Sequence, residues 1–460
     1  MKRIAIVGGG IAGLTAAYEL SCLVSGGVAV EAVLFDASPR LGGIVETVRE
    51  GGFVIECGPD AWVTEKPWAR ELAEELGLGD EIMPSNDAAR KTYVLMDHQL
   101  KSMPDGMRMM VPSNLDALDH SDLFSVEARR AYRDEVNRAA ELKASPPPQD
   151  ESVAQFVQRH FGSEVLEKIA APLLRGVFGG DVAKLSVNAV MAPFVAMERE
   201  HGSLISAMQI RAAAKESNES AVFTTLQSGL GTLVDRMIAA IPKAWIHLGT
   251  AIHSIARDGD SWNVKTSSTQ EAFDAILMAA PVHVARTLLQ PTDARAAELM
   301  EMDASSAVIV AFGFPEATEF STPPGFGFLV PQDSGSRLLA CTFVDQKFAS
   351  RVPKNGKLVR AFFGGDAAER LMRCGNDEVA SVARLELAPI LGPLPEPQVT
   401  VVRRWPKSLP QYAVGHIERM KELEERLLKI PGLSLLGNGY RGVGLPDLIR
   451  DARAAARQIA

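Results

Sequence analysis

The stretch "AIVGGGIAGLTAAYEL", Ala5 to Leu20, decides the fold. Its apolar start predicts a short buried strand over residues 2–7, and the residues after the glycines predict a helix from about Ile11. The intervening turn fills the pattern G-x-G-x-x-G with Gly8, Gly10 and Gly13. These glycines permit, in order, a tight turn, close approach of the backbone to a pyrophosphate, and close packing of the helix on the strand. The helix N-terminus then offers free N–H groups to the phosphates.

A second apolar strand, "VEAVLFDA", ends at Asp36. An acidic residue about 20 residues after such a turn binds a ribose hydroxyl and disfavours a 2′-phosphate. The ligand is therefore expected to be FAD or NAD rather than NADP. The basic start of the chain also imitates a secretion leader, but the apolar run before Gly8 is short and Glu19 interrupts the next one. We therefore interpret this stretch as the start of a nucleotide-binding domain.

The bulk composition describes a globular protein. The chain has 460 residues and is 47% hydrophobic and 23% charged. Its net charge of −9 does not favour binding to nucleic acid. No window approaches the roughly 18 apolar residues of a membrane-spanning helix. The four cysteines are scattered, which indicates reduced thiols in a cytoplasmic protein. Neither a metal-ligand cluster nor a G-x-S-x-G nucleophile motif is present.

The remaining patterns divide the chain into parts. Gly51-Gly52 and Asp258-Gly259 indicate hairpin turns, residues 112–213 are almost wholly helical, and short strands between 305 and 402 predict an antiparallel or mixed sheet. The helical block includes the loop "SPPPQDES" and a capped helix from Ser152. A strand, a glycine loop and a helix close the chain and can return to the first sheet. That unit would set N–H groups between residues 442 and 447 against an electron-rich ring edge.

Nearly the full length of the chain resembles the FAD-dependent protoporphyrinogen and coproporphyrinogen oxidases of haem biosynthesis, which belong to the flavin amine oxidase superfamily. The matching motifs include "SPRLGG", "ECGPDAW", "APLLRGVFGGD", "TLQSGLGTLVD", "RRWPKSLPQYAVGH" and "GNGYRGVGLPDLI". Among them, "PLLRGVFGGD" and "GVGLPDLI" are the most specific to porphyrinogen oxidases.

The resemblance implies an α/β fold, α+β overall, with a Rossmann-like FAD-binding domain of the amine-oxidase type, a substrate domain on a mixed sheet, and a helical insertion. The expected FAD-binding domain is discontinuous and comprises residues 1–65, 215–290 and 400–460. The substrate-binding domain comprises 66–110 and 291–399. Residues 111–214 form the helical domain, which is where relatives contact membranes.

The resemblance also implies the contacts of a non-covalent FAD. They are Gly8, Gly9, Gly10, Ile11, Ala12, Gly13, Asp36, Ala37, Arg40, Gly42, Gly43, Gly58, Pro59, Asp60, Ala61, the backbone of Ile252, Trp405, Val443, Gly444 and Leu445. In the substrate pocket, Leu329 and Leu339 would form one apolar wall and Phe348 the other. Gly176 lies where family members offer a carbonyl group to pyrrole N–H groups.

A porphyrinogen can lose hydride without a strong enzymic base, because the flavin carries the chemistry and oxygen reoxidises it. Six electrons leave in three flavin cycles, each of which releases hydrogen peroxide. We therefore assign no catalytic side chain and no metal. Other flavin amine oxidases or desaturases, a pyridine-nucleotide dehydrogenase and a non-enzymatic flavin- or haem-binding protein remain alternatives.

The choice of porphyrinogen depends on basic residues. Arg90, Lys91 and Arg175 are candidates for one basic entrance to the substrate pocket, here called a mouth. One such mouth suits the two propionates of protoporphyrinogen IX. Lys347 and Arg351 could form a second mouth, which would suit the four propionates of coproporphyrinogen III. The sequence favours protoporphyrinogen IX, with coproporphyrinogen III as the close alternative. We expect a cytoplasmic protein with membrane contact that is at most peripheral, and transfer of the product to the next haem-pathway enzyme.

We predict that the purified protein is yellow and that acid denaturation releases all of its flavin, because no cysteine is well placed to form a covalent link. The absorbance of the supernatant after acid precipitation measures the released flavin. Flavin that stays with the precipitate would contradict the non-covalent assignment. A colourless protein would exclude every flavin function.

Overall fold

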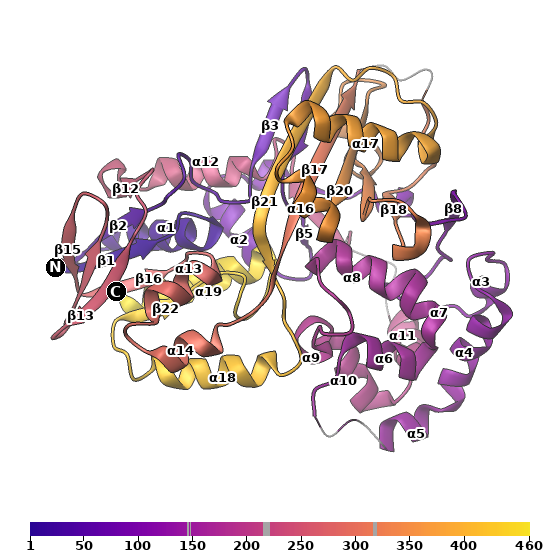
Figure 1. The fold of residues 1–460 in the computed structure, drawn as a ribbon, viewed down its shortest axis with the longest axis horizontal. Helices are drawn as coiled ribbons and strands as arrows, with labels where there is room; N and C mark the ends of the chain where they lie inside the picture. Colours follow the sequence, from indigo (N-terminus) through magenta and orange to yellow (C-terminus); the bar gives the residue numbers. More distant parts are fainter. Residues whose placement is uncertain (145–146, 148, 215–220, 316–319) are drawn as a thin grey trace.

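A computed structural model of the chain describes residues 1–144, 147, 149–214, 221–315 and 320–460. The expected loop at 145–152 and the expected domain boundary at 215 therefore lie partly or wholly outside the described residues. Figure 1 shows three parts: a sheet near both ends of the chain, a second and larger sheet, and a group of helices below the second sheet.

The first sheet has five parallel strands, so the carboxyl ends of its strands lie along one edge. In spatial order they are β12 (Ile246–His247), β2 (Val30–Phe35), β1 (Lys2–Val7), β16 (Ala275–Met278) and β22 (Leu433–Leu435). The predicted strand over 2–7 is confirmed, and β2 ends directly before Asp36. Because β22 joins this sheet, the C-terminal unit returns to it as predicted.

Helices cover one face of this sheet, and a small three-stranded antiparallel sheet together with further helices covers the other. Successive side chains of each strand point to opposite faces, so both faces are buried. Ile4 and Ile6 of β1 join one buried cluster, whereas Ala5 and Val7 join another. The helices of the first cluster are α1 (Ile11–Ser25), α2 (Trp68–Glu75), α12 (Gly231–Ala240) and α19 (Leu445–Ile459). Those of the second are α13 (Val282–Leu289), α14 (Ala294–Leu299) and α18 (His416–Leu427). The position of α2 differs from the expected division, because its apolar face, with Leu72, packs on the first sheet's helices rather than in the substrate domain.

The second sheet has seven strands and is mixed, as predicted, with a parallel pair between β18 and β7. Its order is β21 (Val399–Pro410), β17 (Ala304–Phe314), β20 (Lys357–Phe363), β19 (Ala340–Phe343), β18 (Gly327–Leu329), β7 (Thr92–Met96) and β8 (Gln99–Ser102). One face packs against α16 (Gly365–Leu371) and α17 (Asn376–Leu391), two helices that the strand-rich pattern did not predict. Residues 400–410, expected in the first domain, belong here because β21 pairs with β17 along its length.

Short elements complete the region of the two sheets, and three of them, β13 (Ser254–Asp258), β14 (Ser261–Lys265) and β15 (Gln270–Phe273), form a small antiparallel sheet on the first sheet. The predicted hairpins at Gly51-Gly52 and Asp258-Gly259 are confirmed. The other small strands are β3 (Thr47–Glu50), β4 (Phe53–Glu56), β5 (Trp62–Val63), β6 (Ile82–Pro84) and β11 (Phe223–Leu226). Single helical turns are α15 (Val344–Lys347) and the 3-10 helices Gly79–Glu81, Asp87–Ala89, Lys243–Trp245, Gln332–Ser334 and Ala349–Arg351.

The third part confirms the predicted helical block. It comprises the hairpin β9 (Met107–Arg108) and β10 (Val111–Pro112), then α3 (Asp116–Asp119), α4 (Val126–Asn137), α5 (Ala139–Ala144), α6 (Val153–Phe161), α7 (Ser163–Val165), a π-helical turn (Leu166–Ala170), α8 (Ala171–Phe178), α9 (Val187–Val190), α10 (Ala192–His201) and α11 (Leu204–Ala214). Ser152 caps α6 as predicted: its hydroxyl accepts the Gln155 N–H at 3.2 Å. Among the residues that the structure describes, no helix has both the length and the apolar character to cross a bilayer.

A buried charged cluster joins four of these helices. His160 of α6 places Nδ1 3.0 Å from Glu135 of α4 and Nε2 3.2 Å from Glu198 of α10. Glu135 also accepts the Ser203 hydroxyl and the Leu204 N–H, each at 2.6 Å, at the start of α11. Because both ring nitrogens face carboxylates, the imidazole binds them best as an imidazolium. Burial lowers the pKa of His160, but the two carboxylates outweigh it and raise the pKa above its ordinary value.

We predict that stability falls as the pH rises from about 6.5 through the raised pKa of His160. The folded state binds this proton more tightly, so the contribution is complete below the unfolded pKa and is lost above the folded one. His160→Gln should weaken this dependence and lower the free energy of unfolding by about 3–5 kcal/mol at low pH, because a buried carboxylate loses its partner. Urea unfolding of both proteins at pH 6 and pH 9 measures the effect. The same change with pH in both proteins would contradict it.

Candidate active site

The glycine turn lies between β1 and α1, at the carboxyl edge of the first sheet. Gly8 has a φ of +104°, and a Cβ there would lie 2.6 Å from the Ala279 carbonyl oxygen. A Cβ on Gly13 would lie 1.8 Å from the Gly8 carbonyl oxygen. At Gly10, by contrast, a Cβ would meet no described protein atom within 4 Å. Internal packing therefore requires glycine at positions 8 and 13, whereas Gly10 leaves the backbone open to a bound group.

The first turn of α1 supplies backbone donors. Gly10 caps this helix, and none of the described side chains bonds to its N-terminus. The N–H groups of Ile11, Ala12 and Gly13 therefore lack intrahelical acceptors. No acidic residue occupies this turn, so its positive dipole end is free to act on a phosphate.

Asp36 stands beside this turn, at the end of β2. Its carboxylate accepts the Gly9 N–H at 2.5 Å, which fixes the side chain against the glycine turn. Its carbonyl oxygen accepts the Thr250 N–H at 2.8 Å. This bond brings the segment leading to Ile252 next to Asp36 and Ala37, so these predicted contacts lie together.

The turn that contains Arg40 lies against the first glycine turn, because the Gly42 N–H donates to the Gly9 carbonyl oxygen at 2.8 Å. The Arg40 guanidinium donates to the Gly43 carbonyl oxygen at 2.5 Å. It also lies 5.7 Å from the centre of the Trp405 ring in β21. This cation–π contact joins the first sheet to the second.

Three side chains hold the loop "ECGPDAW" by its carbonyl oxygens. Trp405 donates to that of Cys57 at 2.6 Å, Arg360 to that of Gly58 at 2.5 Å, and Thr225 to that of Asp60 at 2.8 Å. The C=O and N–H of a trans peptide point in opposite directions. The N–H groups of Gly58 and Ala61 therefore face away from these side chains, and neither has an acceptor among the described residues. Pro59, between them, has no N–H to satisfy.

Asp60 is fixed as an anion in this loop. Lys347 Nζ lies 3.0 Å from each carboxylate oxygen, and Arg360 lies 3.4 Å from one of them. Burial raises the pKa of this carboxyl, but the Lys347 and Arg360 charges outweigh it and lower the pKa to about 2. Asp60 is therefore not suited to general acid–base catalysis near neutral pH. In the same loop, burial raises the pKa of the Cys57 thiol to about 11, so this residue stays protonated.

The C-terminal glycine loop reaches the same edge, because β1, β16 and β22 are neighbouring parallel strands. Gly444 caps α19, with Val443 before it and Leu445 as the first helical residue. No described side chain caps these N–H groups. Asp447 in the first turn is paired with Lys66, whose Nζ lies 2.5 Å away.

The predicted apolar wall lies on the second sheet. Phe328 belongs to the cluster under α17, so Leu329, the next residue of β18, points to the opposite face. Leu339 is partly exposed and packs against Gly364. Helix α8 lies beside β18, and a Cβ on its Gly176 would meet no described atom within 4 Å. The structure thus brings α8 close to the strand that carries Leu329.

The basic residues expected at one mouth lie at two places. Arg90 and Lys91, both exposed, precede β7, and the Lys91 carbonyl oxygen accepts the Phe326 N–H at 2.8 Å, at the start of β18. Arg175 of α8 instead bonds to the side chain of Gln332, beyond the other end of β18. These cations therefore form two separate groups.

The structure contradicts the second mouth that Lys347 and Arg351 could have formed. Lys347 is paired with Asp60, and the fully buried Arg351 bonds to Glu56 at 2.7 Å. The Phe348 ring is 2% exposed and lies within 5.3 Å of both cations, which differs from the accessible wall that was expected. From the sequence, Lys347 and Arg351 look like solvent-exposed surface charges. In the structure both are buried, and carboxylates from distant positions in the chain neutralise them.

Sequence reasoning missed three residues that shape the site. Arg360 binds the Gly58 carbonyl oxygen, Thr225 that of Asp60, and Glu46 pairs with Arg403 at 2.7 Å. Arg360 had a usable signal: an arginine inside the apolar strand "KLVRAFF" needs a buried partner. Thr225 opens the matched motif "TLQSGLGTLVD", but that match assigned it no role, and for Glu46 we find no comparable signal.

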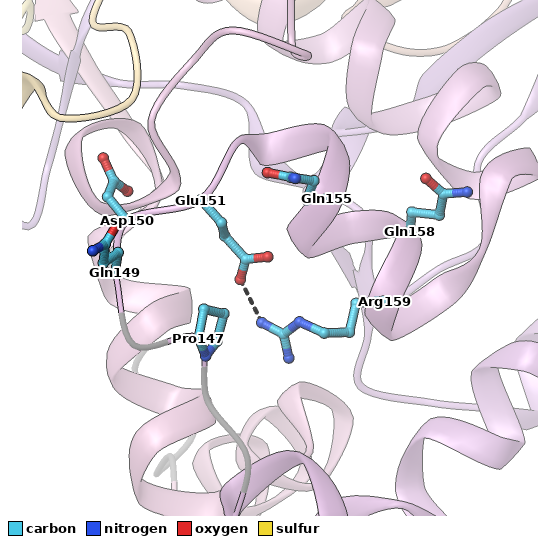
Figure 2. A pocket seen from close by; sticks show the side chains of 7 residues that line it. All are labelled: Pro147, Gln149, Asp150, Glu151, Gln155, Gln158 and Arg159. Carbon is cyan, nitrogen blue, oxygen red and sulfur yellow. Dashed lines mark hydrogen bonds and ion pairs between the residues drawn. The ribbon is translucent and has the colours of Figure 1, made fainter.

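Two cavities flank these parts. The larger, of about 510 Å³, is lined by Pro147, Gln149, Asp150, Glu151, Gln155, Gln158 and Arg159. Figure 2 shows Glu151 paired with Arg159 there, in the helical part, and no predicted contact lines it. The second, of about 370 Å³, borders Arg40 and Leu41 beside the first sheet. Only the second of these two cavities touches a predicted contact.

A parallel sheet with this glycine turn, an acidic residue after β2 and a second sheet bonded to the first indicate a dinucleotide-dependent oxidoreductase. The profile of the family described as flavin containing amine oxidoreductase matches residues 11–460. The chain belongs to this family and, within it, to the porphyrinogen oxidases.

Individual relatives agree with this assignment. The chain is 32% identical to coproporphyrinogen III oxidase of Bacillus subtilis (strain 168), over 99% of this chain and 97% of that protein. It is 28% identical to protoporphyrinogen oxidase 1, chloroplastic, of Spinacia oleracea, over 99% of this chain and 83% of that protein. A solved structure from Exiguobacterium sp. 255-15, provisionally named protoporphyrinogen oxidase, has a TM-score of 0.86 and 31% identity over 100% of this chain and 98% of that one.

The predicted cofactor, FAD, and the predicted class of reaction, oxidation of a porphyrinogen, are thereby confirmed. The residues fit this cofactor, because Gly10 is open and the N–H groups of Gly58 and Ala61 have no acceptor in the described part of the chain. When bound, FAD supplies the acceptor for the substrate's hydride. The individual contacts at this site stay predictions.

We predict that Gly10→Val yields folded protein without FAD. The new side chain meets no protein atom near its Cβ but occupies the space in which we expect the pyrophosphate. Gly13→Val should instead destabilise the apoprotein by about 1–3 kcal/mol or more, because its Cβ collides with the Gly8 carbonyl group. Flavin absorbance per protein and urea unfolding of the apoproteins measure the two effects. Full flavin content in Gly10→Val would contradict the expected placement of the pyrophosphate.

Proposed function

We propose that the substrate is coproporphyrinogen III, which the enzyme oxidises to coproporphyrin III. This choice replaces protoporphyrinogen IX, which the sequence favoured. The observation that carries it is the separation of the basic residues: Lys91 lies near one end of β18, and Arg175 near the other. Four propionates need cations on both sides of the pocket, whereas two propionates need them on one side only.

The spacing supports this proposal. Residues 326–330 follow the extended path of β18, which at about 3.3 Å per residue spans roughly 13 Å. The apolar side chain of Leu329 lies between the two ends. An apolar side chain on an extended strand with a cation group beyond each end suits a macrocycle that carries carboxylates around its rim.

The name of the Bacillus subtilis relative supports the same substrate. The Bacillus subtilis protein is named for coproporphyrinogen III and is more similar to this chain than the spinach protein named for protoporphyrinogen. Both matches extend over nearly the whole chain, so they reflect all three parts of the fold.

The chain's own residues orient the substrate and exclude water from it. Asp60 holds no proton near neutral pH. We propose that no single titratable side chain is indispensable to the hydride step. We further propose that oxygen is the final electron acceptor and is released as hydrogen peroxide. Any contact with a membrane would be peripheral and would involve the helical part. The product would pass to the next enzyme of the pathway.

We predict that kcat/KM is at least tenfold higher for coproporphyrinogen III than for protoporphyrinogen IX, a difference of about 1.4 kcal/mol in transition-state binding. Oxygen uptake with each porphyrinogen measures this ratio. Lys91→Gln and Arg175→Gln should each lower kcat/KM for coproporphyrinogen III about tenfold, because each removes a charge-assisted contact.

The matched control is Arg130→Gln on α4, whose side chain is 81% exposed and which should leave both rates unchanged. A tenfold preference for protoporphyrinogen IX would reverse the choice of substrate. Equal effects of all three substitutions would contradict the roles given to Lys91 and Arg175.

A further inference from the structure

The segment from Ser408 to His416, here called the connecting segment, joins the end of β21 to the start of α18. The helical part fixes its backbone. The Ser186 N–H donates to the Tyr412 carbonyl oxygen at 2.7 Å, and the Val414 N–H donates to the Lys184 carbonyl oxygen at 2.9 Å. The segment therefore touches all three parts of the fold and has little freedom to move between them.

Gln411 of the connecting segment holds the turn at the end of α8. Its amide nitrogen donates to the Phe178 carbonyl oxygen at 2.6 Å and to the Leu409 carbonyl oxygen at 2.8 Å. The next carbonyl oxygen, that of Gly179, accepts the Ser305 hydroxyl at 2.6 Å. These bonds tie the turn that follows Gly176 to the second sheet.

Tyr412, the next residue, holds the loop between β22 and α19. Its hydroxyl donates to the Asn438 carbonyl oxygen at 2.6 Å, and the Asn438 amide donates back to the Ser408 carbonyl oxygen at 2.9 Å. The Tyr412 ring is 3% exposed and stacks on His416 with 4.0 Å between the ring centres. This loop leads directly to Val443, which we expect at the edge of the flavin ring.

We propose that Gln411 and Tyr412 are positioning residues that together fix the distance between the bound porphyrinogen and the flavin. Gln411 acts on the substrate side through the Phe178 turn, and Tyr412 acts on the cofactor side through Asn438. The inference rests on the proposed function, because it assigns the substrate to the face of α8 and β18. The two residues are adjacent in the chain and bond to opposite walls of the site.

The separation of the substrate and the flavin must be fixed because the rate of hydride transfer depends steeply on geometry. A displacement of about 1 Å can cost roughly a hundredfold in rate. The substrate turn and the flavin loop belong to different parts of the fold, so a single rigid segment that bonds to both keeps their separation constant.

The two residues should give different signatures. Tyr412→Phe loosens the backbone donors near Val443, which stabilise the reduced cofactor, so the reduction potential of the bound flavin should become more negative. Its saturating rate of anaerobic flavin reduction by coproporphyrinogen III should fall about tenfold, with the apparent Kd for substrate unchanged. Gln411→Met should raise that apparent Kd about fivefold and leave the potential unchanged.

Tyr132→Phe is the matched control, because Tyr132 is fully buried in the helical part and its hydroxyl also donates to a backbone carbonyl oxygen, that of Met110, at 3.0 Å. It should change neither the potential nor the apparent Kd. A Tyr412→Phe potential equal to that of the wild type, or the same shift in Tyr132→Phe, would overturn the proposal. The reduction potential is measured without substrate, so it tests the inference independently of the substrate's identity. If coproporphyrinogen III fails to reduce the wild-type flavin, that result counts against the proposed function alone.

Discussion

The close contact between Gly13 and the Gly8 carbonyl group sets the geometry on which the rest of the site depends. A Cβ on Gly13 would lie 1.8 Å from that oxygen, so α1 can lie directly on the end of β1 only when neither position carries a side chain. This packing places the N-terminus of α1 at the carboxyl edge of the first sheet. β16 and β22 end at the same edge, and the C-terminal helix therefore begins beside the N-terminal one. Two helix N-termini thus lie at the edge of the sheet where we expect the anionic cofactor to bind.

The second constraint is the attachment of the seven-stranded sheet to this edge. Trp405 and Arg360 reach from β21 and β20 to consecutive carbonyl oxygens of the "ECGPDAW" loop. The buried pair between Lys347 and Asp60 reinforces this attachment at low dielectric constant, where removal of either charge would leave the other unpaired. The loop's N–H groups are left on the side away from these side chains. The same bonds that join the sheets therefore also shape the expected cofactor site.

Local sterics explain which predictions succeeded. The strand over 2–7, the helix from Ile11, the hairpin at Gly51-Gly52 and the cap at Ser152 depend on residues close together in the chain, and each is present. The FAD requirement and the family followed from similarly local motifs. The domain boundaries were less accurate, because membership of a sheet depends on strand pairing between distant segments. Residues 400–410 read equally well as part of either sheet, and only their pairing with β17 decides between the two.

The sequence by itself determined the nucleotide-binding unit, its glycines and its acidic residue, because these are steric and electrostatic requirements of one short strand–turn–helix. It also identified the family through motifs spread along the chain. Only the tertiary structure decided which charges are free. Lys347 and Asp60 are 287 positions apart, and Arg351 and Glu56 are 295 apart, so no local pattern reveals that these cations are neutralised. Likewise, Arg175 is separated from Lys91 only because β18 runs between them. Long-range pairing fixes the location of each charge, and for that reason the substrate could be argued only after the chain was folded.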